Sequence, residues 1–255
     1  MIALLWGAGL AALIAIAARR VRALSPDGAV AAFVVGTIIF GAGGLRAALV
    51  LLAFFVPSSL LTRVGRDRKR AVLGEESPTA RNAWQVLANG GVAALCAAGA
   101  FVWGGPFAAA FAGAIAAASA DTWATELGTL SRRPPISIMT FRPVPTGFSG
   151  GITPLGTAAS VAGALSVAIV AWLLRLAPLP AVATAGVAGA LLDSLVGASL
   201  QARNWCPACA RESESSLHHC GTRTIPRRGI AWLQNDGVNV TATLCGALVA
   251  AALAR

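Results

Sequence analysis

The sequence predicts an all-α, polytopic transmembrane helix bundle of about eight helices, on three observations. Hydrophobic residues make up 56% of the 255 residues and charged residues 12%, about half the charged share of an average soluble protein. The mean hydropathy is +0.72, and the stretches 1–18 and 153–174 carry no charged side chain. This composition excludes a disordered chain, a disulfide-rich miniprotein and an ordinary cytosolic enzyme, because no water-soluble globule could bury so much apolar surface.

Polar breaks divide the chain into eight apolar spans, which we expect to form one transmembrane domain over residues 1–255. The first span resembles a signal peptide in length, but Arg19 and Arg20 follow it rather than precede it, so we expect a retained anchor. The second span is short for a bilayer crossing of about 20 residues, and its glycines indicate an interrupted or tilted helix. The expected spans are 1–18, 28–42, 45–62, 83–103, 106–126, 152–175, 180–201 and 230–254.

The distribution of positive charge predicts how these spans are oriented. All of the 20 basic residues except Arg46, Arg175 and Arg255 lie in alternate loops, which must fall on one side of the membrane. That side is cytoplasmic by the positive-inside rule, so we expect an integral protein of the cytoplasmic membrane with both termini outside. Orientation explains the net charge of +10, and no nucleic-acid partner is needed. The basic loops are 19–27, 63–82, 131–150 and 202–229.

Carboxylates within the later spans are the first candidates for a functional site, because ionisable groups in hydrocarbon are costly. Four lie near the cytoplasmic ends of three separate spans: Asp121, Glu126, Asp193 and Asp236. Isolated at that depth they would be neutralised, whereas a divalent cation would keep them charged. Such oxygen donors suit Mg²⁺. The alternative is interhelical hydrogen bonding between buried acids and amides.

Amide side chains recur near these acids at helical spacing, three or four residues apart along one face. In the seventh span a stripe runs from Asp193 through Gly197 to a glutamine, and the glycine allows another segment to approach closely. The amides that we expect to contribute to the same site are Asn89, Gln201, Asn235 and Asn239.

The glycine-rich segment 145–154 runs directly into the sixth span. Thr153 is expected to cap that helix and Pro154 fits its first position, so free backbone N–H groups would face the cytoplasm. A helix terminus of this kind binds phosphate, and Gly150 and Gly151 would let the backbone approach it.

Lys69 is the only lysine in the chain, and it lies in a loop where neighbouring arginines already satisfy the topology. Two interpretations remain open for it: contact with a phosphate group, or a solvated cytoplasmic charge.

The last basic loop contains three of the five cysteines and both histidines, in the pattern C-x2-C-x8-H-H-C. Cys206, Cys209, His219 and Cys220 would supply the ligands of a tetrahedral zinc site. The alternative is a set of free thiols or a redox pair. With all ligands inside the loop 202–229, we expect a structural Zn²⁺ that is separate from catalysis.

Four motifs resemble signature blocks of the integral membrane family called domain of unknown function 92, which includes the plant phytyl-phosphate kinase and the transmembrane protein 19 group. They are DTWATELG at 121–128, the loop 147–157, DSLVGASLQ at 193–201 and NDGVN at 235–239. The chain departs from the family pattern at Phe148 and Ser149, where a Thr-Asn pair is expected.

The resemblance implies a membrane kinase that transfers a phosphoryl group from a nucleoside triphosphate, CTP in the plant member, to an isoprenoid monophosphate. It would assign Asp121, Glu126, Asp193 and Asp236 to Mg²⁺, and Lys69 to the developing charge. A carrier or flippase for polyprenyl phosphate and a lipid-phosphate cytidylyltransferase remain alternatives. Small residues such as Gly91 and Gly99 fit packing within one chain or in a homodimer.

Overall fold

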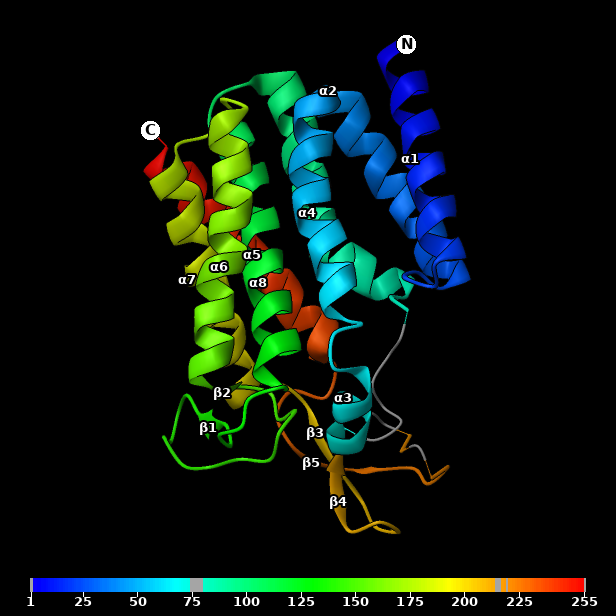
Figure 1. Ribbon diagram of the computed structural model, residues 1–255. Helices are drawn as coiled ribbons and strands as arrows, with labels where there is room; N and C mark the ends of the chain where they lie inside the picture. Colours follow the sequence, from blue (N-terminus) through cyan, green and yellow to red (C-terminus); the bar gives the residue numbers. More distant parts are fainter. Residues whose placement is uncertain (1, 74–79, 214–216, 219, 255) are drawn as a thin grey trace.

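Helices form most of the computed structural model, which describes residues 2–73, 80–213, 217–218 and 220–254. Within these ranges, seven helices are long and apolar enough to cross a membrane. An eighth, α3 (Arg66–Leu73), is a short helix beyond one end of the bundle (Figure 1). The predicted fold class is therefore confirmed. The seven long helices are α1 (Ile2–Arg20), α2 (Pro26–Leu61), α4 (Ala83–Trp103), α5 (Phe107–Gly128), α6 (Pro154–Leu173), α7 (Leu179–Ser199) and α8 (Asn235–Leu253).

Helix α2 explains why eight predicted spans appear as seven helices. It is 36 residues long, and a straight helix of that length would measure about 54 Å against a hydrocarbon core of about 30 Å. Its backbone breaks at Gly44, where φ is 61° and ψ is −157°, a conformation that glycine adopts without a steric penalty. Figure 1 shows the helix folding into two arms of opposite direction. The predicted spans 28–42 and 45–62 are these two arms.

Five short strands lie at the end of the bundle opposite to both chain termini (Figure 1). β1 (Ile136–Ser137) pairs antiparallel with β2 (Gly151–Ile152). A second sheet has the order β4-β3-β5, all antiparallel. The described residues of the loop 202–229 thus include a small sheet, which the sequence did not predict. Its strands are β3 (Arg203–Cys206), β4 (Arg211–Ser213) and β5 (Ile225–Arg228).

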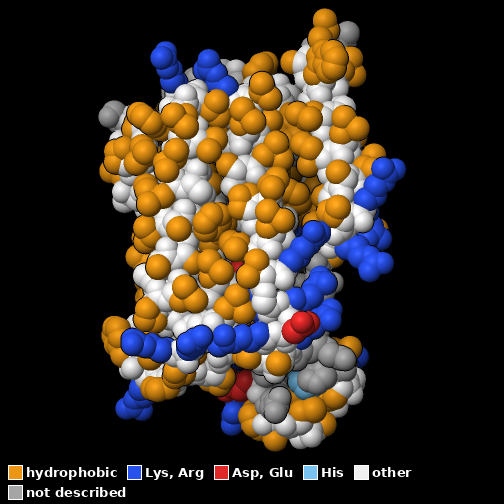
Figure 2. All heavy atoms as spheres, viewed as in Figure 1, with side chains coloured by type: hydrophobic (Ala, Val, Ile, Leu, Met, Phe, Trp, Pro, Cys, Tyr) orange, Lys and Arg blue, Asp and Glu red, His pale blue; other side chains and the backbone are white. Residues whose placement is uncertain are grey.

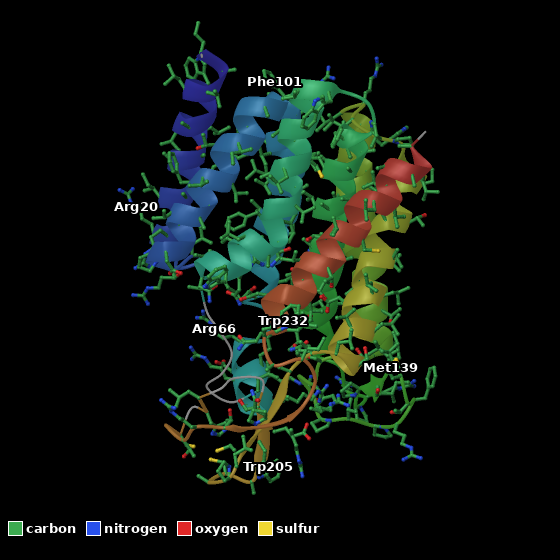
Figure 3. The ribbon with its side chains drawn as sticks, turned by 180° about the vertical axis from the view of Figure 1, so that it is seen from behind. Arg20, Arg66, Phe101, Met139, Trp205 and Trp232 are labelled. Atoms are coloured by element: carbon green, nitrogen blue, oxygen red, sulfur yellow. The ribbon has the colours of Figure 1, made fainter. Side chains whose placement is uncertain are left out.

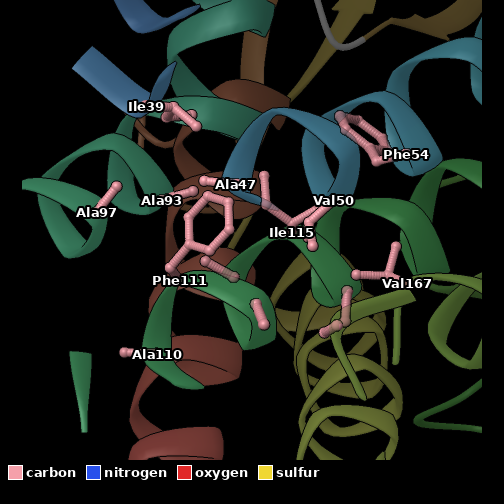
Figure 4. Close-up of a cluster of buried hydrophobic side chains, with 14 of the residues drawn as sticks. Ile39, Ala47, Val50, Phe54, Ala93, Ala97, Ala110, Phe111, Ile115 and Val167 are labelled. Atoms are coloured by element: carbon pink, nitrogen blue, oxygen red, sulfur yellow. The ribbon is translucent and has the colours of Figure 1, made fainter. Parts of the chain in front are cut away.

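Helix α5 lies at the centre of the bundle and contacts α2, α4, α6, α7 and α8. Its residues 109–120 are all buried, and most of them are alanine. Small residues allow the backbones to approach closely: a Cβ atom on Gly113 would lie 2.3 Å from the carbonyl oxygen of Gly246 in α8. Two larger side chains, Phe111 and Ile115, pack into the main apolar cluster (Figure 4).

The outer surface is apolar along the middle of the bundle, and basic side chains gather mainly around the end that carries the strands (Figure 2). Large apolar side chains such as Trp6, Leu95 and Phe101 are more than 70% exposed, as expected for contact with lipid. Phe101 lies at one end of the molecule and Trp205 at the other (Figure 3). The strand end is therefore the basic end, in keeping with the predicted clustering of charge.

Candidate functional site

A cavity of about 400 Å³ opens where seven helices and the loop 131–150 converge. Side chains from α2 to α8 line it. It brings together all of the predicted acid, amide and phosphate-binding residues except Asp236 and Gln201. The predicted residues that line it are Lys69, Asn89, Asp121, Glu126, Gly150, Gly151, Thr153, Asp193, Asn235 and Asn239.

Two carboxylates from separate helices meet at the wall of this cavity. Asp121 of α5 and Asp193 of α7 lie within hydrogen-bonding contact of each other. Asn239 of α8 lines the same cavity and is 8% exposed, and its Oδ1 atom is buried without a hydrogen-bond partner among the described residues. Two acids and an unsatisfied amide oxygen are a donor set that a hard divalent cation prefers.

Glu126 and Lys69 form a buried ion pair on another part of the lining. The Nζ atom of Lys69 lies 2.5 Å from Oε2 of Glu126 and donates a second hydrogen bond to the Leu61 carbonyl oxygen at 2.7 Å. Thr62 donates to the other carboxylate oxygen at 2.6 Å. Lys69 is only 3% exposed, which contradicts its interpretation as a solvated charge. Its remaining donor capacity can serve a ligand in the cavity.

Arg81 adds a second cation to the cavity. Its guanidinium carbon lies 5.6 Å from the ring centroid of Phe54 and 5.8 Å from that of Phe55, within cation–π range. Its Nη2 atom is buried without a hydrogen-bond partner in the described part of the chain. Burial lowers the pKa of Arg81, and the charge of Glu126 opposes that shift. An anionic ligand would satisfy this guanidinium.

The glycine-rich segment lines the cavity, and the predicted cap of α6 is confirmed. Thr153 caps α6 by accepting a hydrogen bond from the Gly156 backbone at 3.0 Å, and Pro154 begins the helix. Gly150 has a φ of 79°, and a Cβ atom there would lie 2.4 Å from the Ala198 side chain. Glycine is therefore required for this segment to lie against α7.

Two predicted residues lie outside the cavity lining, for different reasons. Helix α7 ends at Ser199, so Gln201 lies beyond the helix. Its side chain still lies beside Gly197, since a Cβ atom on that glycine would be 3.3 Å from Oε1 of Gln201, but it does not line the cavity. It is 2% exposed and lies two residues before β3 begins at Arg203. Asp236 lies in the first turn of α8, where its negative charge interacts favourably with the helix dipole. The eighth span thus contributes Asn235 and Asn239 to the cavity in place of Asp236.

A separate cluster of cysteine and histidine lies in the loop 202–229. Cys206, Cys209, His218 and Cys220 place their ligand atoms within 4.8 Å of one another, so they could hold a metal ion. Among the described residues the nitrogen donor of this cluster is His218, whereas the predicted His219 lies outside the described residues.

Distances within this cluster fit the binding of one metal ion by all four residues. Sγ of Cys220 lies 3.1 Å from Nδ1 of His218 and 3.6 Å from Sγ of Cys206. Contacts with Thr222 and His218 lower the pKa of the Cys220 thiol to about 5. Hydrogen bonding to Cys220 raises the pKa of Cys209 to about 11.

Sequence reasoning missed Thr62 and Arg81 as site residues. Thr62 is the last residue of the predicted third span. A threonine there is ordinary for a helix end, so nothing in the sequence marked it as a site residue. Arg81 directly precedes the capping residue of α4, Asn82. An arginine placed at the start of a membrane helix, where its charge opposes the helix dipole, could have been recognised as a candidate.

The fold and the cavity define a polytopic integral membrane protein with a polar cavity at its basic end. A family model described as "Integral membrane protein DUF92" matches residues 9–247. The chain therefore belongs to this family.

Relatives in plants and archaea resemble the chain along most of its length. Protein PGR of Arabidopsis thaliana is 32% identical, over 92% of this chain and 90% of the relative. Uncharacterized membrane protein MJ0933 of Methanocaldococcus jannaschii is also 32% identical, over 92% and 88%. Protein VTE6, chloroplastic, of Arabidopsis thaliana is 26% identical, over 90% and 65%. No solved structure matches the chain.

Proposed function

We propose that the protein is a membrane-embedded kinase that transfers the terminal phosphoryl group of a nucleoside triphosphate, CTP or a similar nucleotide, to an isoprenoid monophosphate. An oxygen of the lipid phosphate attacks the terminal phosphorus, the bond to the nucleoside diphosphate breaks, and a lipid diphosphate forms. No covalent enzyme intermediate is required, because the reaction depends mainly on positioning and neutralisation of charge.

The contact between Asp121 and Asp193 is the observation that carries this proposal. Together with the Oδ1 atom of Asn239 these acids would hold Mg²⁺, which neutralises phosphate oxygens when bound. Lys69, held by Glu126, and Arg81 would contact phosphate oxygens from other parts of the same cavity.

The start of α6 supports the same chemistry through uncharged backbone groups. Backbone N–H groups at a helix N-terminus favour anions, and the segment that ends at Thr153 lines the cavity with Gly150 and Gly151. Cations, a metal-binding set and a phosphate-binding helix terminus are the recurring parts of sites for phosphoryl transfer.

An apolar cavity of about 70 Å³ supports a lipid as the acceptor. It lies among α1, α2 and α4, where Ile14, Val35 and Phe40 contribute to its lining. Arg81, Gln85 and Asn89 line both cavities. A molecule with a phosphate head and a hydrocarbon tail could therefore place its head in the polar cavity and the first few carbon atoms of its tail in the apolar one.

The Cys/His cluster fits Zn²⁺ as its metal. Sulfur atoms at about 2.3 Å from a tetrahedral zinc ion lie about 3.8 Å apart, close to the 3.6 Å between Cys206 and Cys220. One nitrogen and three sulfur ligands form a closed set, which is typical of a structural site rather than a catalytic one. We propose that the active cavity and this cluster face the cytoplasm, as the basic loops predict.

The test is a kinase assay on the protein purified in detergent, with radiolabelled CTP or ATP and phytyl or geranylgeranyl phosphate. Asp121→Asn and Asp193→Asn should each reduce kcat by about 100-fold or more, because charge stabilisation of this kind is worth several kcal/mol. Asp67→Asn is the matched control, since Asp67 is exposed on α3 and does not line the cavity. Full activity of either acid variant would remove that residue from the mechanism.

The same assay separates the alternatives. A product that carries an added CMP unit would indicate a cytidylyltransferase. Uptake of lipid phosphate into liposomes without nucleotide, and without formation of diphosphate, would indicate a carrier. Either outcome would overturn the kinase proposal.

A further inference from the structure

Strand β3 connects the Cys/His cluster directly to the wall of the polar cavity. It is four residues long, with Arg203 at one end and Cys206 at the other, so its length is about 10 Å. Cys206 is fully buried and belongs to the Cys/His cluster. The opposite end of the same strand lies against the glycine-rich segment.

Arg203 makes that contact through two neighbouring residues. Its Nη2 atom donates a hydrogen bond to the Ser149 carbonyl oxygen at 2.8 Å. Its guanidinium carbon lies 3.0 Å from the ring centroid of Phe148. Phe148 and Ser149 both line the cavity, and the arginine is 3% exposed. The arginine therefore fixes the backbone and one ring of the cavity wall.

The sheet that contains β3 is small, and one of its two edge strands is exposed. β4 has three residues and β5 four, and all four residues of β5 are exposed. Strands this short do not form a stable sheet alone. In small units of this kind, a structural metal supplies much of the folding free energy.

We propose that a zinc ion bound by Cys206, Cys209, His218 and Cys220 positions the cavity wall at 148–151 by holding β3, with Arg203 as the positioning residue. The sequence alone indicated a structural zinc site in the loop 202–229, with no connection to the cavity. This inference goes beyond the proposed reaction, since it concerns how the wall is held and not what the cavity transforms.

The experiment measures zinc content and hydrogen exchange on the full chain in detergent, without substrate. The wild-type protein should contain about one zinc per chain, as expected for one closed ligand set. Cys209→Ser should lose the zinc, and deuterium uptake in residues 145–152 should rise about threefold or more, because local opening becomes less costly. Removal of zinc from the wild-type protein by a chelator should give the same change, which covers the case in which the variant does not fold.

Arg203→Lys tests whether Arg203 connects β3 to the cavity wall. Lysine keeps the charge but lacks the planar group that stacks on Phe148 and donates to Ser149. The variant should keep its zinc and still show the raised uptake in 145–152. Arg227→Gln is the control in the same sheet, because Arg227 is exposed and contacts Glu212 and Trp205 but not the cavity wall; it should match the wild type.

Two results would overturn the inference: a protein purified without metal, or loss of zinc that leaves the uptake of 145–152 unchanged. Neither result depends on kinase activity. Failure here leaves the proposed reaction in place, and failure of the kinase assay leaves this inference in place.

Discussion

Lys69 of α3 and Glu126 of α5 form an ion pair with an N–O distance of 2.5 Å, and their side chains are 4% and 19% exposed. The pair joins a short helix outside the bundle to the end of the central helix, beside the cavity. It therefore has a structural role as well as the proposed role towards phosphate.

Removal of one partner of this ion pair should lower the stability of the protein more than removal of both. Lys69→Met leaves the Glu126 carboxylate without its partner, and we expect a loss of about 3 kcal/mol in stability, as for other buried pairs broken on one side. The double variant Lys69→Met/Glu126→Gln should recover most of that loss. Thermal unfolding in detergent measures both.

Arg70→Met is the control for this comparison, because it removes the next cation on α3 and Arg70 is exposed. Its thermal midpoint should equal that of the wild type. A double variant that is no more stable than Lys69→Met would show that the pair is not the cause.

Gly150 should not tolerate a side chain. Gly150→Ala places a Cβ atom 2.4 Å from the Ala198 side chain at a φ of 79°, and backbone strain at such a position costs about 1–3 kcal/mol. We expect a lower thermal midpoint and lower kinase activity, measured on the same preparation.

Gly91→Ala is the matched control, since a Cβ atom there meets nothing within 4 Å. Gly91 lies inside α4, where alanine should stabilise the helix by about 0.5–1 kcal/mol. Equal effects of the two substitutions would contradict the placement of Gly150 against α7.

Arg81 should affect binding of the phosphate substrate more than turnover. Arg81→Lys keeps a cation but loses stacking on Phe54 and Phe55, so we expect KM for the lipid phosphate to rise about tenfold with little change in kcat. Steady-state kinetics in mixed micelles measure both constants. Arg20→Lys, at an exposed position on α1, should leave them unchanged. A fall in kcat at constant KM would assign Arg81 to the transferred phosphoryl group instead.

Both chain ends should lie on the side of the membrane opposite to the cavity. In a bacterial host, green fluorescent protein joined to the C-terminus should remain dark and alkaline phosphatase joined there should be active. A fluorescent fusion truncated at residue 140, in the loop at the cavity end, should be bright. The reverse pattern would invert the orientation predicted from the basic loops.

Hydropathy and charge predicted that acids of separate helices lie at one level along the bundle, but not how each helix is rotated. Asp121 and Asp193 were expected at one level, and they meet there. Asp236 is at a similar depth, yet one residue along a helix turns the side chain by about 100°. Asn235 and Asn239, four residues apart, share the face that meets the cavity. No sequence pattern distinguishes these two faces before the neighbouring helices are known.

The small sheet could not be predicted for a different reason. Strands of two to four residues are too short to show an alternating pattern. The spacing of Cys206, Cys209 and Cys220 indicated that the loop folds on itself, but not that Arg203 reaches Phe148. That contact joins segments more than fifty residues apart.

The alanine-rich core of α5 has a consequence for how substrate range can change. The side chains at 109–120 are mostly alanine, so the backbone of α5 already lies close to those of its neighbours. Larger side chains there would push apart the helices that carry Asp121 and Asp193. The proposed metal site between these two acids is therefore fixed in position. For the proposed lipid substrate, adaptation to a shorter or longer chain has to proceed at the periphery. There α1 and the first arm of α2 carry larger side chains that can be exchanged without disturbing the acids.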